Sequence, residues 1–203
     1  MCHGLWGSVS HLKSLEEVIT DVHARRSTGP DDPVLHVLSP RTNESDLTYD
    51  GIDLCAHRAI LEIDEYISSL SSTAKDDTST SSADAETVPE RRRVTRFSIV
   101  GYSLGGLIAR YVVGVLESRS PSLFETVEAV NFTTFASPAI GIPRFPSFVS
   151  RATSYLGARI LSNTGQQIYV EDDYLNGKPL LELMAQPGES ARNHSPIVCR
   201  LVN

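Results

Sequence analysis

Ser103 lies in a segment whose composition is typical of a nucleophilic serine, Val100-Gly101-Tyr102-Ser103-Leu104-Gly105-Gly106. The pattern Gly-x-Ser-x-Gly places a serine hydroxyl on a sharp strand-to-helix turn, from which it can attack an ester carbonyl carbon. The pattern alone is weak evidence because it is short and the chain holds 13 glycines. Its context is stronger, since the apolar run 97–100 precedes it and the apolar run 107–113 follows it. An idle serine on a nucleotide-binding turn is the alternative, but no Gly-x-Gly-x-x-Gly spacing and no following lysine support it.

Attack on an ester creates an oxyanion, which two backbone N–H groups usually stabilise. One expected donor is the N–H of Leu104, because the residue after the nucleophile supplies it in this arrangement. The segment His3-Gly4-Leu5-Trp6-Gly7 predicts the second donor, the N–H of Leu5. We expect His3 to be structural, because the catalytic base of such sites follows the nucleophile along the chain.

These residues need a scaffold, and the hydrophobic periodicity predicts one in which helices and strands alternate. Apolar residues recur at helical spacing in three segments, 11–26, 51–70 and 105–117. Short apolar runs predict strands at 34–38, 94–100 and 127–135. The order favours one α/β domain with a parallel sheet and helices on both faces. Residues 71–93 are rich in Ser, Thr and Asp, and predict a disordered surface loop.

Beyond single motifs, the chain resembles the family called "putative serine esterase", DUF676, whose fungal members include lipid-droplet phospholipases. The matching stretches are His3–Gly7, Leu47–Asp53, Gly101–Tyr111, Asn131–Pro138 and Gly177–Ala185. The resemblance implies an α/β-hydrolase fold and hydrolysis of carboxylic esters of lipids, of lipase or phospholipase type. It implies no metal and no cofactor.

A serine nucleophile also needs an acid and a histidine to activate it. The candidates that follow Ser103 in the required order are Asp172 or Asp173 and then His194, all in polar segments. The resemblance ends near Ala185, and only two residues precede His3. We therefore expect a chain truncated at both ends, which leaves three functions open. They are an active lipid esterase, an inactive fragment or pseudoenzyme of the family, and an acyltransferase on the same fold.

The net charge, the cysteines and the lengths of the apolar runs bear on the partners and the location of the protein. A net charge of −7 argues against binding to nucleic acid. Three scattered cysteines, no signal peptide and no apolar run of membrane-spanning length predict an intracellular protein, cytoplasmic or peripheral to a membrane or lipid droplet. Residues 140–161 carry apolar side chains at helical spacing with three arginines, which predicts either a helix packed on the sheet or a lid that contacts lipid.

Overall fold

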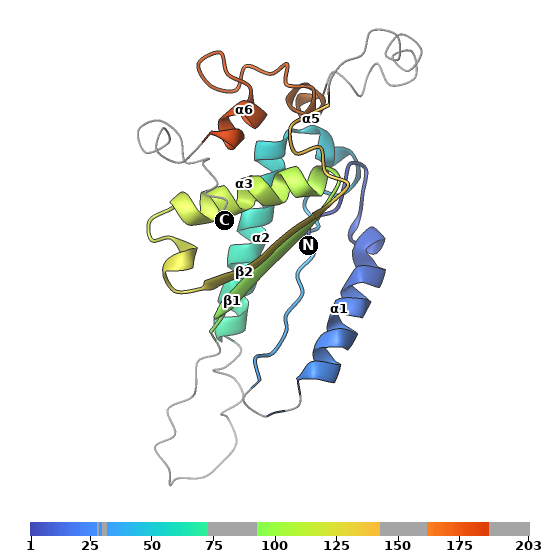
Figure 1. Cartoon of the computed structure of the whole chain (residues 1–203), viewed down its shortest axis with the longest axis vertical. Coiled ribbons are helices and arrows are strands. Elements are labelled where there is room, and N and C mark those ends of the chain that lie inside the picture. Colours follow the sequence, from blue (N-terminus) through green and yellow to red (C-terminus); the bar gives the residue numbers. More distant parts are fainter. Residues whose placement is uncertain (28, 30–31, 73–92, 143–161, 187–203) are drawn as a thin grey trace.

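Two parallel strands and two long helices form the centre of the protein (Figure 1). The computed structural model describes residues 1–27, 29, 32–72, 93–142 and 162–186. Strand β1 (Arg96–Tyr102) leads into helix α3 (Leu104–Ser118), and the chain returns as β2 (Glu128–Phe135). Arg96 lies opposite Glu128 and Tyr102 opposite Phe135, with one irregularity between Phe97 and Ser98. The α/β character is therefore confirmed, with a sheet of two strands among the described residues.

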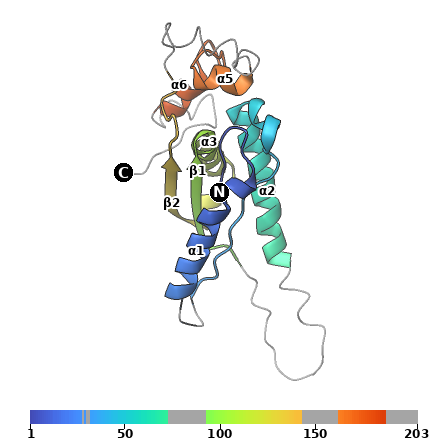
Figure 2. The same cartoon turned by 90° about the vertical axis from the view of Figure 1, so that its right-hand side faces the viewer.

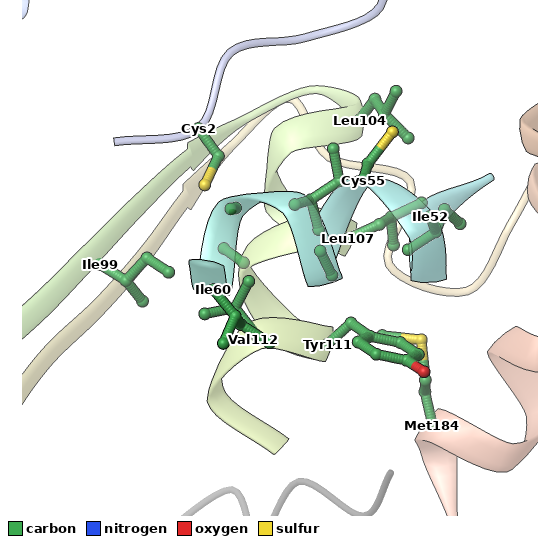
Figure 3. Packing of buried hydrophobic residues seen from close by; sticks show 14 of the residues in the cluster. Cys2, Ile52, Cys55, Ile60, Ile99, Leu104, Leu107, Tyr111, Val112 and Met184 are labelled. Carbon is green, nitrogen blue, oxygen red and sulfur yellow. The ribbon is translucent and has the colours of Figure 1, made fainter. Parts of the chain in front are cut away.

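The hydrophobic core lies between α3 and helix α2 (Ile52–Ser72), with β1 against α3 (Figure 3). Helix α2 presents its apolar residues at helical spacing, and those of α3 face them. The fully buried large side chains include Ile52 and Cys55 from α2 and Leu104, Leu107, Val112 and Leu116 from α3. The predicted helices 51–70 and 105–117 and the strands near 94–100 and 127–135 are confirmed within about two residues.

The N-terminal helical segment stands apart from this core. It begins as a 3₁₀ turn, η1 (Val9–Leu12), and continues as α1 (Lys13–Arg26), which confirms the predicted helix at 11–26. Helix α1 contacts η1 and has no buried side chain. Its apolar stripe is only partly covered. Leu15 and Ile19 are half-buried, whereas 59% of Val18 and 43% of Val22 are accessible to solvent. Figure 2 shows α1 separate from α2.

The prediction of a buried strand at 34–38 is wrong. These residues form no strand, and Val34 is 78% exposed. A strand exists only when a neighbour accepts and donates its backbone hydrogen bonds. The backbone of this segment accepts one hydrogen bond among the described residues, from the amino group of Met1 to the carbonyl of Leu38, and the His36 side chain contacts Tyr66. Without a longer partner, an apolar run of five residues stays irregular.

The shorter elements gather at one end of α2 (Figure 1). They are η2 (Ser45–Tyr49), α5 (Asn163–Ile168) and α6 (Leu180–Ala185), while η4 (Leu123–Glu125) precedes β2. Most of the predicted loop at 71–93 and most of the predicted lid at 140–161 lie outside the described residues. Across the described ranges, no helix combines the length and apolarity needed to cross a bilayer.

Candidate active site

Ser103 occupies the turn between the last residue of β1 and the first residue of α3. Its backbone has φ 53° and ψ −123°, a strained conformation for a residue with a side chain. The Ser103 N–H donates to the carbonyl of Phe135 at the end of β2, at 2.8 Å, and its carbonyl accepts from Gly106 at 3.0 Å. These bonds hold the turn, so the strain is maintained by the sheet and the helix together.

The two glycines of the motif are required by close packing. A Cβ on Gly101 would lie 2.4 Å from the carbonyl oxygen of Gly105, within the turn itself. A Cβ on Gly105 would lie 2.1 Å from the carbonyl oxygen of Cys2 and 2.5 Å from that of His3. Gly105 thus makes room for the N-terminal segment, a reason that the local motif does not reveal.

The N-terminal loop lies directly beside Ser103, although about a hundred residues separate them along the chain. Cys2 extends the sheet, since its N–H donates to Val100 at 2.8 Å and its carbonyl accepts from Tyr102 at 3.0 Å. A Cβ on Gly4 would lie 3.0 Å from the Cβ of Ser103. Figures 1 and 2 both place the N-terminus next to β1. The two motifs that the sequence analysis paired are therefore adjacent.

The two expected donors fit this arrangement. Leu104 is the first residue of α3, where an N–H has no partner inside the helix and the helix dipole favours negative charge. Leu5 is half-buried in the loop that runs past Ser103. Neither N–H has an assigned acceptor within the described part of the chain.

The structure gives the candidate acids other partners. Asp172 accepts a hydrogen bond from the N–H of Leu180 at 2.8 Å, and Asp173 accepts one from Gly177 at 2.8 Å. Both carboxylates therefore hold local turns. His194 lies outside the described residues, and the Ser103 hydroxyl has no hydrogen-bond partner among those described.

A polar cluster along α3 escaped the sequence analysis. The hydroxyls of Tyr111 and Tyr174 are 3.0 Å apart, and the ring of His57 lies edge-on to Tyr111 at 5.5 Å. Burial, and then the bond to Tyr174, raise the pKa of the buried Tyr111 hydroxyl. No spacing connects these three positions, so no pattern could have found them. Among the described residues, no cluster of three His, Cys, Asp or Glu side chains could hold a metal.

The fold and the site define an α/β protein with a strained serine between strand and helix, beside a glycine-containing N-terminal loop. The chain belongs to the family described as "Putative serine esterase (DUF676)", whose model matches residues 1–196. The expectation of this family from the sequence is therefore confirmed.

Yeast proteins are similar to parts of the chain. "Putative lipase ROG1" of Saccharomyces cerevisiae is 36% identical over 93 residues, which cover 45% of this chain and 13% of that protein. "Putative lipase YDL109C" of the same yeast is 34% identical over 94 residues, 46% of this chain and 14% of that protein. "Putative lipase C4A8.10" of Schizosaccharomyces pombe is 32% identical over 99 residues, 47% and 12% respectively. The chain thus matches about one seventh or less of each relative's length, and no solved structure matches it significantly.

Proposed function

We propose that the chain is a serine hydrolase for carboxylic esters of lipids, built on an α/β-hydrolase fold. The observation that carries the proposal is Ser103, strained at φ 53° at the start of α3 and packed against Gly4 of the N-terminal loop. Family membership and the names of the yeast relatives support lipid esters as the substrate class.

In the proposed reaction, the Ser103 oxygen attacks the ester carbonyl carbon and loses its proton to a general base. The carbonyl oxygen becomes an oxyanion, which the N–H groups of Leu5 and Leu104 stabilise. The bond to the alcohol breaks, the alcohol leaves with the proton, and an acyl group stays on Ser103. Water then attacks this acyl-enzyme, releases the fatty acid and restores the serine.

The proposed reaction also needs a general base. His194 is the histidine that follows Ser103 in the sequence, and it lies outside the described residues. Asp172 accepts from Leu180 through Oδ2, while its buried Oδ1 has no hydrogen-bond partner among the described residues, and Asp173 accepts from Gly177 through Oδ1. Either aspartate would therefore orient the histidine through its second carboxylate oxygen and keep its present bond. The second candidate function is an inactive member of the family. It is favoured by the Ser103 hydroxyl, which has no hydrogen-bond partner among the described residues. An acyltransferase differs only in using an alcohol instead of water.

A fluorophosphonate probe tests the proposal, because it phosphonylates activated serines and releases fluoride. We expect the full chain to be labelled at Ser103, and Ser103→Ala to lower labelling and ester hydrolysis at least about a thousandfold. Mass spectrometry of the labelled peptide identifies the site. Ser98→Ala is the matched control, because Ser98 lies on the same strand with its side chain exposed. A folded wild-type chain that resists the probe would favour the inactive function instead.

The nature of the second product separates the remaining possibilities. With a long-chain ester and an added alcohol, a hydrolase releases the free fatty acid, whereas an acyltransferase forms the new ester.

We further propose that the protein acts at the surface of membranes or lipid droplets inside the cell, because its proposed substrates reside there. Binding to phospholipid vesicles, measured by sedimentation, tests that location.

A further inference from the structure

The peptide group between Gly4 and Leu5 is held from both sides of its carbonyl oxygen. That oxygen accepts a hydrogen bond from the N–H of Gly7 at 3.0 Å, and Nδ1 of the buried His3 lies 3.0 Å from it. A trans peptide group is planar, with its C=O and N–H pointing in opposite directions. Fixing the Gly4 oxygen therefore also fixes the direction of the Leu5 N–H.

The next peptide group, between Leu5 and Trp6, is held by a residue from a different element. The N–H of Trp6 donates to Oγ1 of Thr48 in η2, at 3.2 Å. Trp6 has φ 55°, in the left-handed region that a residue with a Cβ rarely adopts. Such a conformation persists only when its surroundings enforce it. The bond to Thr48 is one such constraint.

Thr48 is well suited to this task. Its side chain is fully buried, and its hydroxyl donates its proton to the carbonyl of Ser45 at 2.7 Å. The oxygen of Thr48 is thereby left to accept from Trp6. A second bond joins the same two elements, since the N–H of Ser45 donates to the carbonyl of Gly7 at 3.0 Å.

Thr48 is in turn attached to α5. Its carbonyl accepts from the hydroxyl of Thr164 at 2.6 Å, and the Thr164 oxygen accepts from the N–H of Gly51 at 2.9 Å. All of Thr48, Thr164 and the Gly51 amide are buried. The position of Thr48 is therefore determined by two elements on either side of it, and not by η2 alone.

We propose that Thr48 is a positioning residue for the oxyanion hole: it holds the Leu5–Trp6 turn so that the Leu5 N–H is available to the developing oxyanion. This inference rests on the proposed function of Ser103 and Leu5. Thr48 itself touches neither substrate nor the reacting atoms. Because its effect is on the transition state, its loss should lower kcat and leave KM nearly unchanged.

The test compares a substitution that keeps the shape of Thr48 with one that keeps its hydroxyl. Thr48→Val keeps the branched shape and removes the acceptor, whereas Thr48→Ser keeps the hydroxyl. Loss of one oxyanion donor lowers kcat about 10²–10³-fold in other hydrolases, and a misplaced donor should cost part of that. We expect the rate of fluorophosphonate labelling, and kcat for a soluble p-nitrophenyl ester, to fall at least about tenfold in Thr48→Val. Thr48→Ser should stay within about threefold of wild type.

A purely structural role predicts a different pattern. The urea midpoint of Thr48→Val would then fall, while the labelling rate per folded molecule would equal that of wild type, and this result would overturn the inference. Amide hydrogen exchange of Trp6 is a second readout that needs no activity, and it should accelerate in Thr48→Val but not in Thr48→Ser. Unchanged Trp6 exchange in Thr48→Val would also overturn the inference. If Thr48→Val does not fold, Thr48→Ala replaces it with the same expectations.

Failure of the proposed function gives a distinct result. Wild type and Thr48→Ser would then both resist the probe, while Trp6 exchange would still report whether Thr48 fixes the loop. In that case the proposed role of Thr48 in the oxyanion hole would be overturned together with the proposed function of Ser103. Equal labelling of wild type and Thr48→Val, by contrast, would overturn only the role of Thr48.

Discussion

Gly105 is the residue at which helix α3 meets the backbone of the N-terminal loop. The ideal Cβ position at Gly105 lies inside the contact distance of two carbonyl oxygens, those of Cys2 and His3. Neither oxygen belongs to a flexible side chain, so an added methyl group must displace backbone that pairs with β1. Because α3 and the N-terminal loop are in contact at Gly105, the conformation of the turn at Ser103 depends on the position of the loop that carries Leu5.

We predict that Gly105→Ala destabilises the protein by about 1–3 kcal/mol or more, as overpacking of a tight contact does. It should also slow labelling of Ser103, because the loop must move away from it. Urea unfolding and probe labelling measure the two effects. Gly29→Ala is the matched control, since the nearest atom to its Cβ would be 3.6 Å away, and we expect a change within about 0.5 kcal/mol. Equal effects of the two substitutions would contradict the packing argument.

At the scale of elements, α5 completes the N-terminus of α2. The residue before the helix is Gly51, which has no side chain with which to cap the first amides. The side chains of α5 supply the acceptors: Thr164 accepts from the N–H of Gly51, and Oε1 of Gln167 accepts from the N–H of Ile52 at 2.6 Å. Gln167 also donates to Asp53 at 2.9 Å. Helix α5, with six residues, thus supplies the hydrogen-bond acceptors for the first N–H groups of α2, a helix of 21 residues.

We predict that Gln167→Ala lowers the free energy of unfolding by about 1–3 kcal/mol, because it leaves the buried N–H of Ile52 without an acceptor. Thermal or urea unfolding measures the loss. Gln166→Ala removes the same kind of side chain from the preceding position, which is exposed. It should change the free energy of unfolding by less than about 0.5 kcal/mol. A stable Gln167→Ala variant would show that water replaces the amide.

Sequence reasoning predicted the long elements because their evidence is local. The apolar spacing of 51–70 and 105–117 is a property of each segment, and the structure has helices there. Residues 34–38 failed because a strand depends on a partner elsewhere in the chain. Helix α5 was missed, since six residues are too few for a hydrophobic period to be recognised. The adjacency of the Ser103 and Leu5 segments was predicted from the paired motifs, whereas the bond from Trp6 to Thr48, 42 residues apart, follows no spacing rule.

Across the whole molecule, stability is concentrated between α2, α3 and β1. The side chains buried there include Leu116 at 0% exposure, whereas α1 contributes no buried side chain. The partly exposed apolar stripe of α1 makes it a peripheral element of the described structure. The free energy of unfolding should therefore respond very differently to changes in these two regions.

We predict that the double variant Val18→Lys and Val22→Lys changes the free energy of unfolding by less than about 1 kcal/mol, because both side chains are already in solvent. Leu116→Ala removes buried volume and should cost about 2–5 kcal/mol. Urea titrations monitored by circular dichroism compare the two. A loss in the double variant as large as that in Leu116→Ala would show that α1 packs on the protein in solution.

The cap that α5 provides for α2 also has a consequence for how the chain is made. The Ile52 amide and the Gln167 side chain that satisfies it are 115 residues apart. At about 5–20 residues per second, a ribosome needs roughly 6–23 s to synthesise the segment between them. During that interval the N–H groups of Gly51 and Ile52 lack their acceptors on α5, and the carbonyl of Thr48 lacks the hydrogen bond from Thr164. The loop beside Ser103 therefore reaches its final geometry only after residue 167 has been synthesised, and so after both β1 and β2.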